Sequence, residues 1–136
     1  MSLQVLCHAT EDEDKIMKSI ENVVGIENID KMKIASQPLK GYYNDPIILT
    51  KIEVLDPSIS LEIVKNIFSR LSEYERSEAV KGGLEMGRHG GKLYIRLDKQ
   101  TAYKGVLKLS DKDSIRIEIG IRGDINKFLK LLNIEG

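Results

Sequence analysis

Hydrophobic and polar residues alternate most regularly at SIRIEIGI (114–121), in the last third of the chain. Four isoleucines occupy every second position from 115 to 121, and Arg116 and Glu118 stand between them. The segment KLYIRLD (92–98) alternates in the same way, with Leu93, Ile95 and Leu97 sharing a side. Successive side chains of a strand point to opposite faces, so both segments predict strands with one buried face and one exposed face.

Other segments space their hydrophobic residues as a helix does. One follows Thr10, which has capping-box spacing to Glu13, and another follows Asp56-Pro57, where proline takes the first helical position. A third is expected after Asp124. A shorter helix is predicted from Ser72, which has capping-box spacing to Glu75, to about residue 81.

Three further strands are predicted, at 3–9, 31–36 and 46–55, with residues 37–46 read as a loop. Gly90-Gly91 is predicted as a hairpin turn between 84–89 and 92–98, and 106–110 as another strand. This order predicts an α+β fold of one domain, residues 1–136, in which helices cover mainly one face of an antiparallel sheet.

Composition places the chain among soluble globular proteins. It has 136 residues, of which 41% are hydrophobic and 31% charged, and the longest apolar runs are too short to span a bilayer. Cys7 is its single cysteine, which excludes an internal disulfide framework and suits a reducing compartment. We therefore expect a cytoplasmic protein with no membrane association, no cofactor and no metal.

Charge is balanced overall but unevenly distributed. The chain has 21 Lys and Arg against 21 Asp and Glu, yet residues 81–108 contain seven basic side chains against Glu85 and Asp98. A basic face of this kind can attract a polyanion even when the net charge is zero.

The centre of this basic segment reads GRHGGKLYIRLDKQTAYKG (87–105). Strand alternation directs Lys92, Tyr94 and Arg96 away from the core. Cations neutralise phosphates, and tyrosine offers either a ring for stacking or a hydroxyl group. The candidate RNA-binding residues are Arg88, Lys92, Tyr94, Arg96, Lys99, Gln100, Tyr103 and Lys104. The alternative is an ordinary solvated sheet face, which often carries lysine and arginine.

Other reactive residues have simpler explanations. Cys7-His8 with His89 would suggest a thiol nucleophile, but Cys7 falls on the core side of its strand and no third group orients the pair. The acidic run 11–14 would suggest a divalent-metal site, but it suits the start of a helix. Tyr42-Tyr43 lies in the predicted loop, either as a contact surface or packed.

Three stretches resemble a known family when taken together: CHATEDEDK (7–15), GYYNDPI (41–47) and GGKLYIRLDKQTAYKG (90–105). They are similar to an archaeal family of small RNA-binding proteins, described as an exosome subunit with a fold like that of double-stranded-RNA-binding domains. The resemblance also implies an architecture related to the ribosomal protein that docks 5S rRNA. It assigns RNA contacts to Arg96, Lys99, Gln100, Tyr103 and Lys104.

These observations together predict a non-catalytic protein that recognises the backbone and shape of RNA and works beside the exosome. The alternative is a protein–protein adaptor or homodimer that uses the same charged face, with exosome subunits or a second copy as partners. We expect no catalytic residues, because no pair of carboxylates and no histidine cluster has a convincing placement.

Overall fold

The alternating isoleucines of 114–121 form a central strand, β6 (Ser114–Arg122), in the computed structural model of the protein, which describes residues 1–41 and 45–132. All four isoleucines are buried. On one side β6 pairs antiparallel with β5 (Gly90–Asp98) over nine residue pairs. On the other side it pairs antiparallel with β1 (Ser2–His8) over only three.

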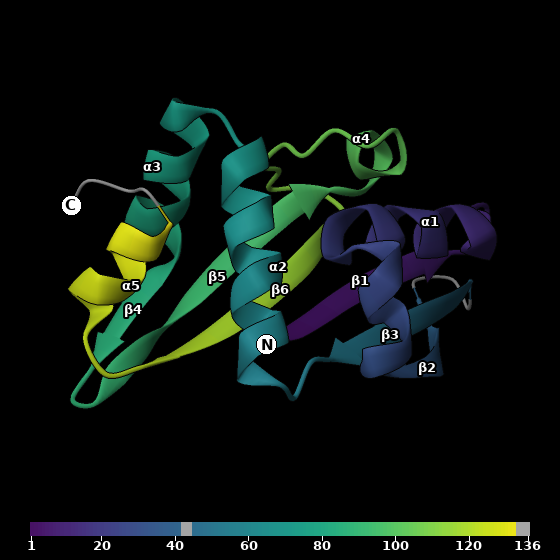
Figure 1. Ribbon diagram of the computed structural model, residues 1–136. Helices are drawn as coiled ribbons and strands as arrows, with labels where there is room; N and C mark the ends of the chain where they lie inside the picture. Colours follow the sequence, from purple (N-terminus) through teal and green to yellow (C-terminus); the bar gives the residue numbers. More distant parts are fainter. Residues whose placement is uncertain (42–44, 133–136) are drawn as a thin grey trace.

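Across the described residues, the sheet has six strands in the order β2-β3-β1-β6-β5-β4, and every neighbouring pair is antiparallel. The remaining strands are β2 (Lys33–Lys40), β3 (Pro46–Glu53) and β4 (Leu84–Gly87). Figure 1 shows the sheet running behind the helices from the β4–β5 hairpin to the β2–β3 hairpin. The β1–β6 pairing therefore joins two three-stranded halves.

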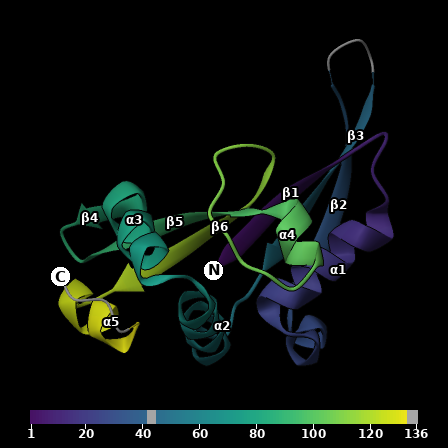
Figure 2. The same cartoon turned by 90° about the horizontal axis from the view of Figure 1, so that it is seen from above.

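Helices cover one face of this sheet. Figure 2 shows α1 (Glu13–Val24), α2 (Pro57–Arg70) and α5 (Ile125–Leu131) together on one side, while the loop between α4 and β6 rises from the other. The other helical elements are α3 (Glu73–Gly83), α4 (Lys99–Tyr103) and the 3-10 helix η1 (Ile26–Lys31). We call the uncovered side the open face. The predicted α+β fold, with an antiparallel sheet and helices mainly on one face, is confirmed.

Most predicted helix starts are confirmed by their caps. Asp56 and Asp124 accept backbone N–H bonds as N-caps, and Ser72 and Glu75 form the reciprocal capping box. The first helix is the exception, because its N-cap is Asp12 rather than Thr10. Asp12 accepts the N–H of Asp14, so the acidic run does serve the helix start.

Three strand predictions were wrong in detail. Residues 37–40 continue β2 instead of forming a loop, and 106–110 contributes one isolated bridge, Leu97 to Leu109, instead of a strand. The hairpin turn consists of Arg88 and His89, whereas Gly90-Gly91 already belongs to β5. Gly90 is needed for another reason: its φ is +132°, and a Cβ there would meet the backbone carbonyl oxygen of Ile121.

This close approach gives a stability prediction. Gly90→Ala should lower the free energy of unfolding by about 2 kcal/mol or more, because a strained φ alone costs roughly 1–3 kcal/mol. Urea denaturation measures the change. Gly82→Ala is the matched control, because a Cβ at this helical glycine meets open space, and alanine should stabilise by roughly 0.5–1 kcal/mol. Equal effects of the two substitutions would contradict the explanation.

Candidate nucleic-acid interface

The structure divides the exposed members of the predicted RNA-binding set between two surfaces. Lys92, Tyr94 and Arg96 lie on exposed alternate positions of β5, on the open face. Arg88 is exposed in the β4–β5 turn. The later residues belong to α4, a short helix that the sequence interpretation missed and that packs against α1.

Hydrogen bonds from α1 hold the α4 residues in place. The side-chain amide of Asn22, in α1, donates to the carbonyl oxygens of Ala102 at 2.8 Å and Tyr103 at 3.1 Å. The Tyr103 ring is partly exposed, with the ammonium of Lys15 5.6 Å from its centroid. Gln100 and Lys104 are exposed. These residues thus form a surface separate from the β5 face.

Lys99 does not belong to an exposed surface at all. Its side chain is only 2% exposed, so the ammonium is not presented to a partner as the predicted RNA contact requires. Its ammonium donates to the Leu6 carbonyl oxygen and to Glu11 Oε1, both at 2.8 Å, and pairs with Asp113 Oδ2 at 2.9 Å. A buried ammonium requires such partners, because an unpaired charge in the interior is costly.

Asp113 links this buried lysine to the surface. Its Oδ1 lies 3.2 Å from His8 Nε2 and its Oδ2 contacts Lys99. Burial raises the pKa of the Asp113 carboxyl, but the hydrogen bond and charge of Lys99, helped by His8, outweigh burial and lower it. Lys99 therefore fastens β1, the start of α1 and the loop before β6 to one another.

The same network explains a group with metal-ligand chemistry. Ligand atoms of His8, Glu11 and Asp113 lie within 4.8 Å of one another. The Lys99 ammonium already contacts both carboxylates and supplies the positive charge that a cation would bring. The cluster is thus accounted for as an ion-pair network.

Cys7 and His89 are not brought together. Cys7 is buried, and burial, followed by the negative charge of Glu11, raises the pKa of its thiol. His89 lies in the β4–β5 turn, at the opposite end of the sheet from the Cys7 end of β1 (Figure 1). A raised pKa disfavours the reactive thiolate, so Cys7 has the character of a structural cysteine. Tyr42 and Tyr43 lie outside the described residues.

The strand registers place basic residues from distant parts of the chain in one row. Arg96 of β5 stands opposite Arg116 of β6, Arg116 opposite Gln4 of β1, and Gln4 opposite Lys51 of β3. Neighbouring strands are about 4.8 Å apart, so these four positions span about 14 Å. We call Arg96, Arg116, Gln4 and Lys51 the cationic row. Sequence alternation gave the outward direction of Arg116, but only the registers bring the four together.

The arrangement of the cationic row lowers the stability of the sheet. Like charges directly opposite one another on a sheet destabilise it, and Arg96 faces Arg116. None of the three cations forms a salt bridge within residues 1–41 and 45–132. A hollow of about 250 Å³ adjoins the row. Gln4, Arg96 and Arg116 line it, together with the carboxylates of Asp111 and Asp113. An anion bound here would relieve the repulsion.

The neighbouring positions modify this surface. Lys92 pairs with Glu118 at 3.0 Å, and this hydrogen bond raises the pKa of the Lys92 ammonium. Lys92 therefore stays charged, but the Glu118 carboxylate offsets its charge. Tyr94 is 38% exposed and lines a second hollow, of about 560 Å³, together with Arg96. Asp111 lines both hollows and limits the positive surface at the β5 end.

Comparison with known proteins identifies the family of this chain. Residues 1–121 match the model of a family described as RNA binding. The chain belongs to this RNA-binding family. It is 32% identical over 118 residues to the uncharacterized protein MJ0213 of Methanocaldococcus jannaschii, covering 85% of this chain and 78% of that protein. It is 28% identical over 123 residues to RNA-binding protein PAB1135 of Pyrococcus abyssi, covering 88% and 79% respectively.

A solved structure of another archaeal protein has the same fold. Protein SSO0741 of Sulfolobus solfataricus, from the family DUF54, superposes with a TM-score of 0.78 at 26% identity, covering 97% of this chain and 96% of that one. Within the described residues, no helix is long and apolar enough to cross a membrane.

The buried lysine gives a second stability prediction. Lys99→Ala should lower the free energy of unfolding by about 2–3 kcal/mol, because it leaves the Leu6 carbonyl and two carboxylates without their donor. The loss should be smaller than for a fully buried ion pair, because Glu11 and Asp113 are partly solvated. Thermal or urea unfolding measures it. Lys104→Ala, an exposed neighbour, should change stability little; equal losses would contradict the assignment.

The lowered pKa of Asp113 predicts a pH dependence. Its carboxylate stabilises the fold fully above the unfolded-state pKa of about 3.9, and this contribution is lost as pH falls through the lower folded-state pKa. Asp113→Asn should therefore be less stable at neutral pH and lose less stability on acidification below about pH 4. Urea unfolding across pH tests this, with Asp30→Asn as the exposed control. An unchanged acid slope in Asp113→Asn would contradict the network.

Proposed function

We propose that this protein binds RNA on the open face of its sheet, through the cationic row. The observation that carries the proposal is the placement of Arg96 opposite Arg116, with Lys51 in line and no salt bridge to any of the three within the described part of the chain. Phosphate oxygens are the ligands that such guanidinium groups pair with best. Membership of the RNA-binding family supports the same partner.

The chemistry of this face favours contact with the RNA backbone. Arginine and lysine neutralise phosphates without reading base sequence, whereas Gln4 can bond a phosphate, a 2′-hydroxyl or a base edge. Tyr94 is exposed beside the row and offers one ring for stacking. The proposed contacts are therefore Tyr94, Arg96, Arg116, Gln4 and Lys51, with Lys92 and Arg88 flanking them.

The α4 residues Gln100, Tyr103 and Lys104 form the competing surface. They are exposed, but the Tyr103 ring already contacts the Lys15 ammonium. The helix also packs on α1, away from the open face. We assign them a smaller role. Association with the exosome, a non-catalytic role and kinship with the 5S-rRNA-docking protein stay predictions from the resemblance.

Binding should depend on the charges of the cationic row. The triple variant Lys51→Gln/Arg96→Gln/Arg116→Gln should bind RNA about tenfold or more weakly, and the slope of log K against log salt should fall by about 2–3, close to one per lost phosphate contact. Fluorescence anisotropy with labelled single-stranded and duplex RNA, over a salt series, measures both quantities.

The matched control removes three exposed lysines of the helices, Lys65→Gln/Lys81→Gln/Lys130→Gln, and so changes net charge equally. It should retain nearly the full affinity and salt slope. A third variant, Gln100→Ala/Lys104→Gln, tests the α4 surface. Loss of binding in the α4 variant, with the cationic-row variant unaffected, would overturn the assignment; absence of RNA binding by the native protein at low salt would overturn the function.

A further inference from the structure

Part of β6 lacks a neighbouring strand on one side. β1 pairs with β6 only from Ser2–Glu118 to Gln4–Arg116, and no other strand of residues 1–41 and 45–132 lies along Ile119–Arg122 on that side. Figure 1 shows β1 starting at the lower end of α2, while β5 and β6 continue past it to the β4–β5 hairpin. We call this exposed edge, with the groove beside it, the strand notch.

The hydrogen-bond pattern shows which backbone groups face the strand notch. Met1 and Val54 exchange both of their bonds, at 3.3 Å and 2.9 Å, so Ser2 directs its backbone toward Glu118 of β6. Backbone direction alternates along an antiparallel strand, so the N–H and C=O groups of Gly120 and Arg122 point the same way as those of Glu118. They therefore face the strand notch.

The β5 side agrees with this assignment. The N–H of Gly123 donates to the His89 carbonyl oxygen at 3.4 Å, so odd-numbered residues of this region direct their backbones toward β5. A Cβ on Gly120 would meet nothing within 4 Å. Two consecutive hydrogen-bonding positions of a sheet are thus presented at an open edge.

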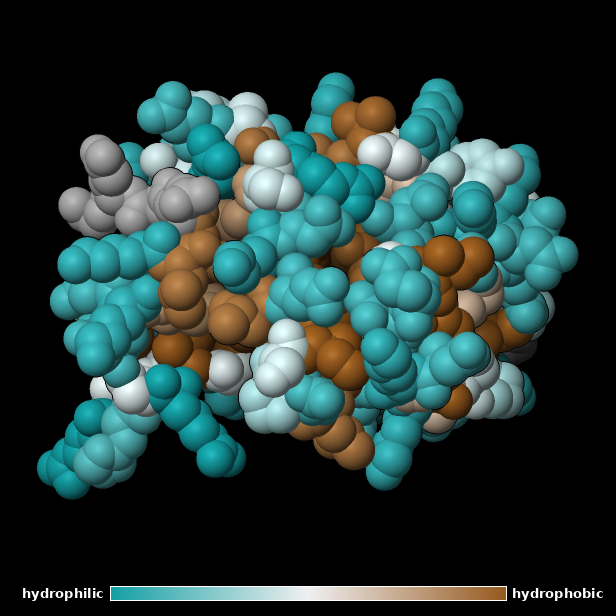
Figure 3. Space-filling model, in the orientation of Figure 1, coloured by the Kyte–Doolittle hydropathy of each residue, from teal (hydrophilic) through white to brown (hydrophobic). Residues whose placement is uncertain are grey.

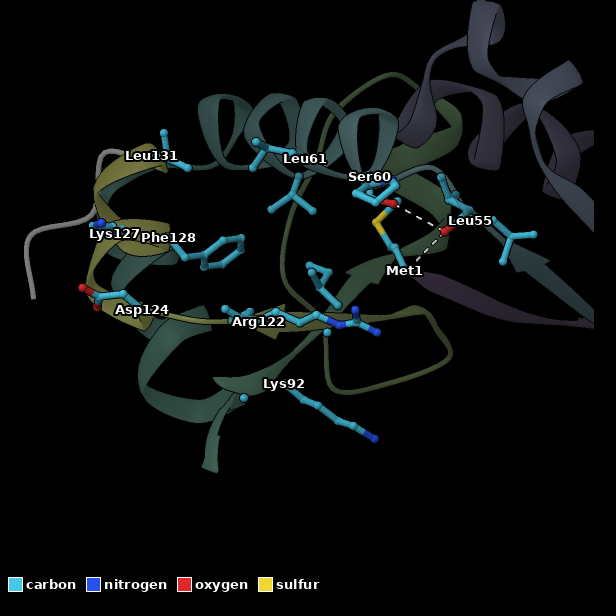
Figure 4. A pocket seen from close by; sticks show the side chains of 17 residues that line it. Met1, Leu55, Ser60, Leu61, Lys92, Arg122, Asp124, Lys127, Phe128 and Leu131 are labelled. Atoms are coloured by element: carbon cyan, nitrogen blue, oxygen red, sulfur yellow. Dashed lines mark hydrogen bonds between the residues drawn. The ribbon is translucent and has the colours of Figure 1, made fainter. Parts of the chain in front are cut away.

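An apolar groove of about 840 Å³ adjoins this edge. Its walls include Leu61 and Val64 of α2 and Phe128 and Leu131 of α5. Figure 3 shows hydrophobic side chains gathered at the surface between α5 and α2. Figure 4 shows Phe128 directed into the gap from α5, Met1 at its end and Arg122 along the β6 wall. The groove would receive every second side chain of a strand laid along β6.

The charges around the groove are mainly positive. Arg122 and Lys127 line it, and neither forms a salt bridge with any part of the chain that the structure describes. Among the described lining residues, Asp124 provides the one carboxylate, and it is occupied as the N-cap of α5, where it accepts the N–H of Asn126 at 2.9 Å. Acidic side chains of a partner would be attracted, and basic ones repelled.

We propose that the strand notch binds an extended segment of a partner protein whose apolar residues alternate with acidic ones. The segment adds to the sheet antiparallel to β6 and in line with β1, bonds the backbones of Gly120 and Arg122, and places its apolar side chains between α2 and α5. This is strand addition, in which the backbone supplies affinity and the groove supplies specificity. It does not depend on RNA binding, which uses the open face.

Amide exchange tests the proposal directly. In the free, full-length protein, the amides of Gly120 and Arg122 should exchange rapidly with solvent while those of Ile119 and Ile121, bonded to β5, are protected. The probe is a capped heptapeptide in which valine alternates with glutamate. Its addition should protect Gly120 and Arg122. The same peptide with N-methyl groups on the amides facing β6 should not bind, because it lacks the donors.

Two variants distinguish binding in the groove from nonspecific hydrophobic binding. Leu131 lines the groove and is 48% exposed, so the Leu131→Glu variant should fold normally. It should bind the peptide about tenfold more weakly, because it loses apolar contact and its new carboxylate repels the glutamates of the peptide. Ile26→Glu makes the same change at a 68% exposed residue outside the groove and should leave binding unchanged.

The proposal is overturned by any of four results. The first is that the peptide does not bind at millimolar concentration. The second is that it binds while the Gly120 and Arg122 amides stay unprotected, and the third is that the N-methylated peptide binds equally well. The fourth is that these amides become protected as the protein dimerises, monitored by light scattering, since a second copy is then the occupant.

Discussion

The short ladder between β1 and β6 is the constraint on which the rest of the structure depends. In the part of the chain that the structure describes, only three residue pairs join the β2-β3-β1 half of the sheet to the β6-β5-β4 half. One of these pairs, Gln4 with Arg116, carries the cationic row across the join, from Arg96 to Lys51. Where the ladder ends, at Ser2, the backbone of β6 is left open and the strand notch begins. Both proposed binding surfaces therefore follow from one register.

Lys99 supports this join from the other end of β1. Its ammonium bonds the Leu6 carbonyl and the carboxylates of Glu11 and Asp113, so it ties β1 to the loop that leads into β6. That loop also carries Asp111, which borders the hollows beside Arg96. The buried charge thus contributes to RNA binding only indirectly, by fixing the strands on which the exposed cations stand.

Much of the fold could be predicted from local patterns. The alternation in 92–98 and 114–121 and the caps at Asp56, Ser72 and Asp124 depend on neighbouring residues, so the sequence shows them directly. The turn was predicted at Gly90-Gly91 because glycine is common in turns. Glycine is also found where two backbones approach closely, and this is its role here. The α4 helix is only five residues long, too short for a hydrophobic period to show.

The candidate site was harder to predict because it depends on which strands pair. Arg96 was identified from its own strand, but its partners Arg116, Gln4 and Lys51 are distant in sequence and join it only through three ladders. The sequence does not distinguish Lys99 from its exposed neighbours, because a lysine just after a strand with one exposed face is usually solvated. Its burial depends on Glu11 and Asp113, which lie about a hundred residues apart in the chain.

RNA binding by the cationic row can be tested by an NMR titration of the labelled protein with a short RNA, following arginine Nε–H and backbone amide signals. The largest changes should fall on the Nε–H groups of Arg96 and Arg116 and on the amides around Gln4 and Lys51. Changes centred on α4 and α1, with the arginine signals of the open face unmoved, would contradict it.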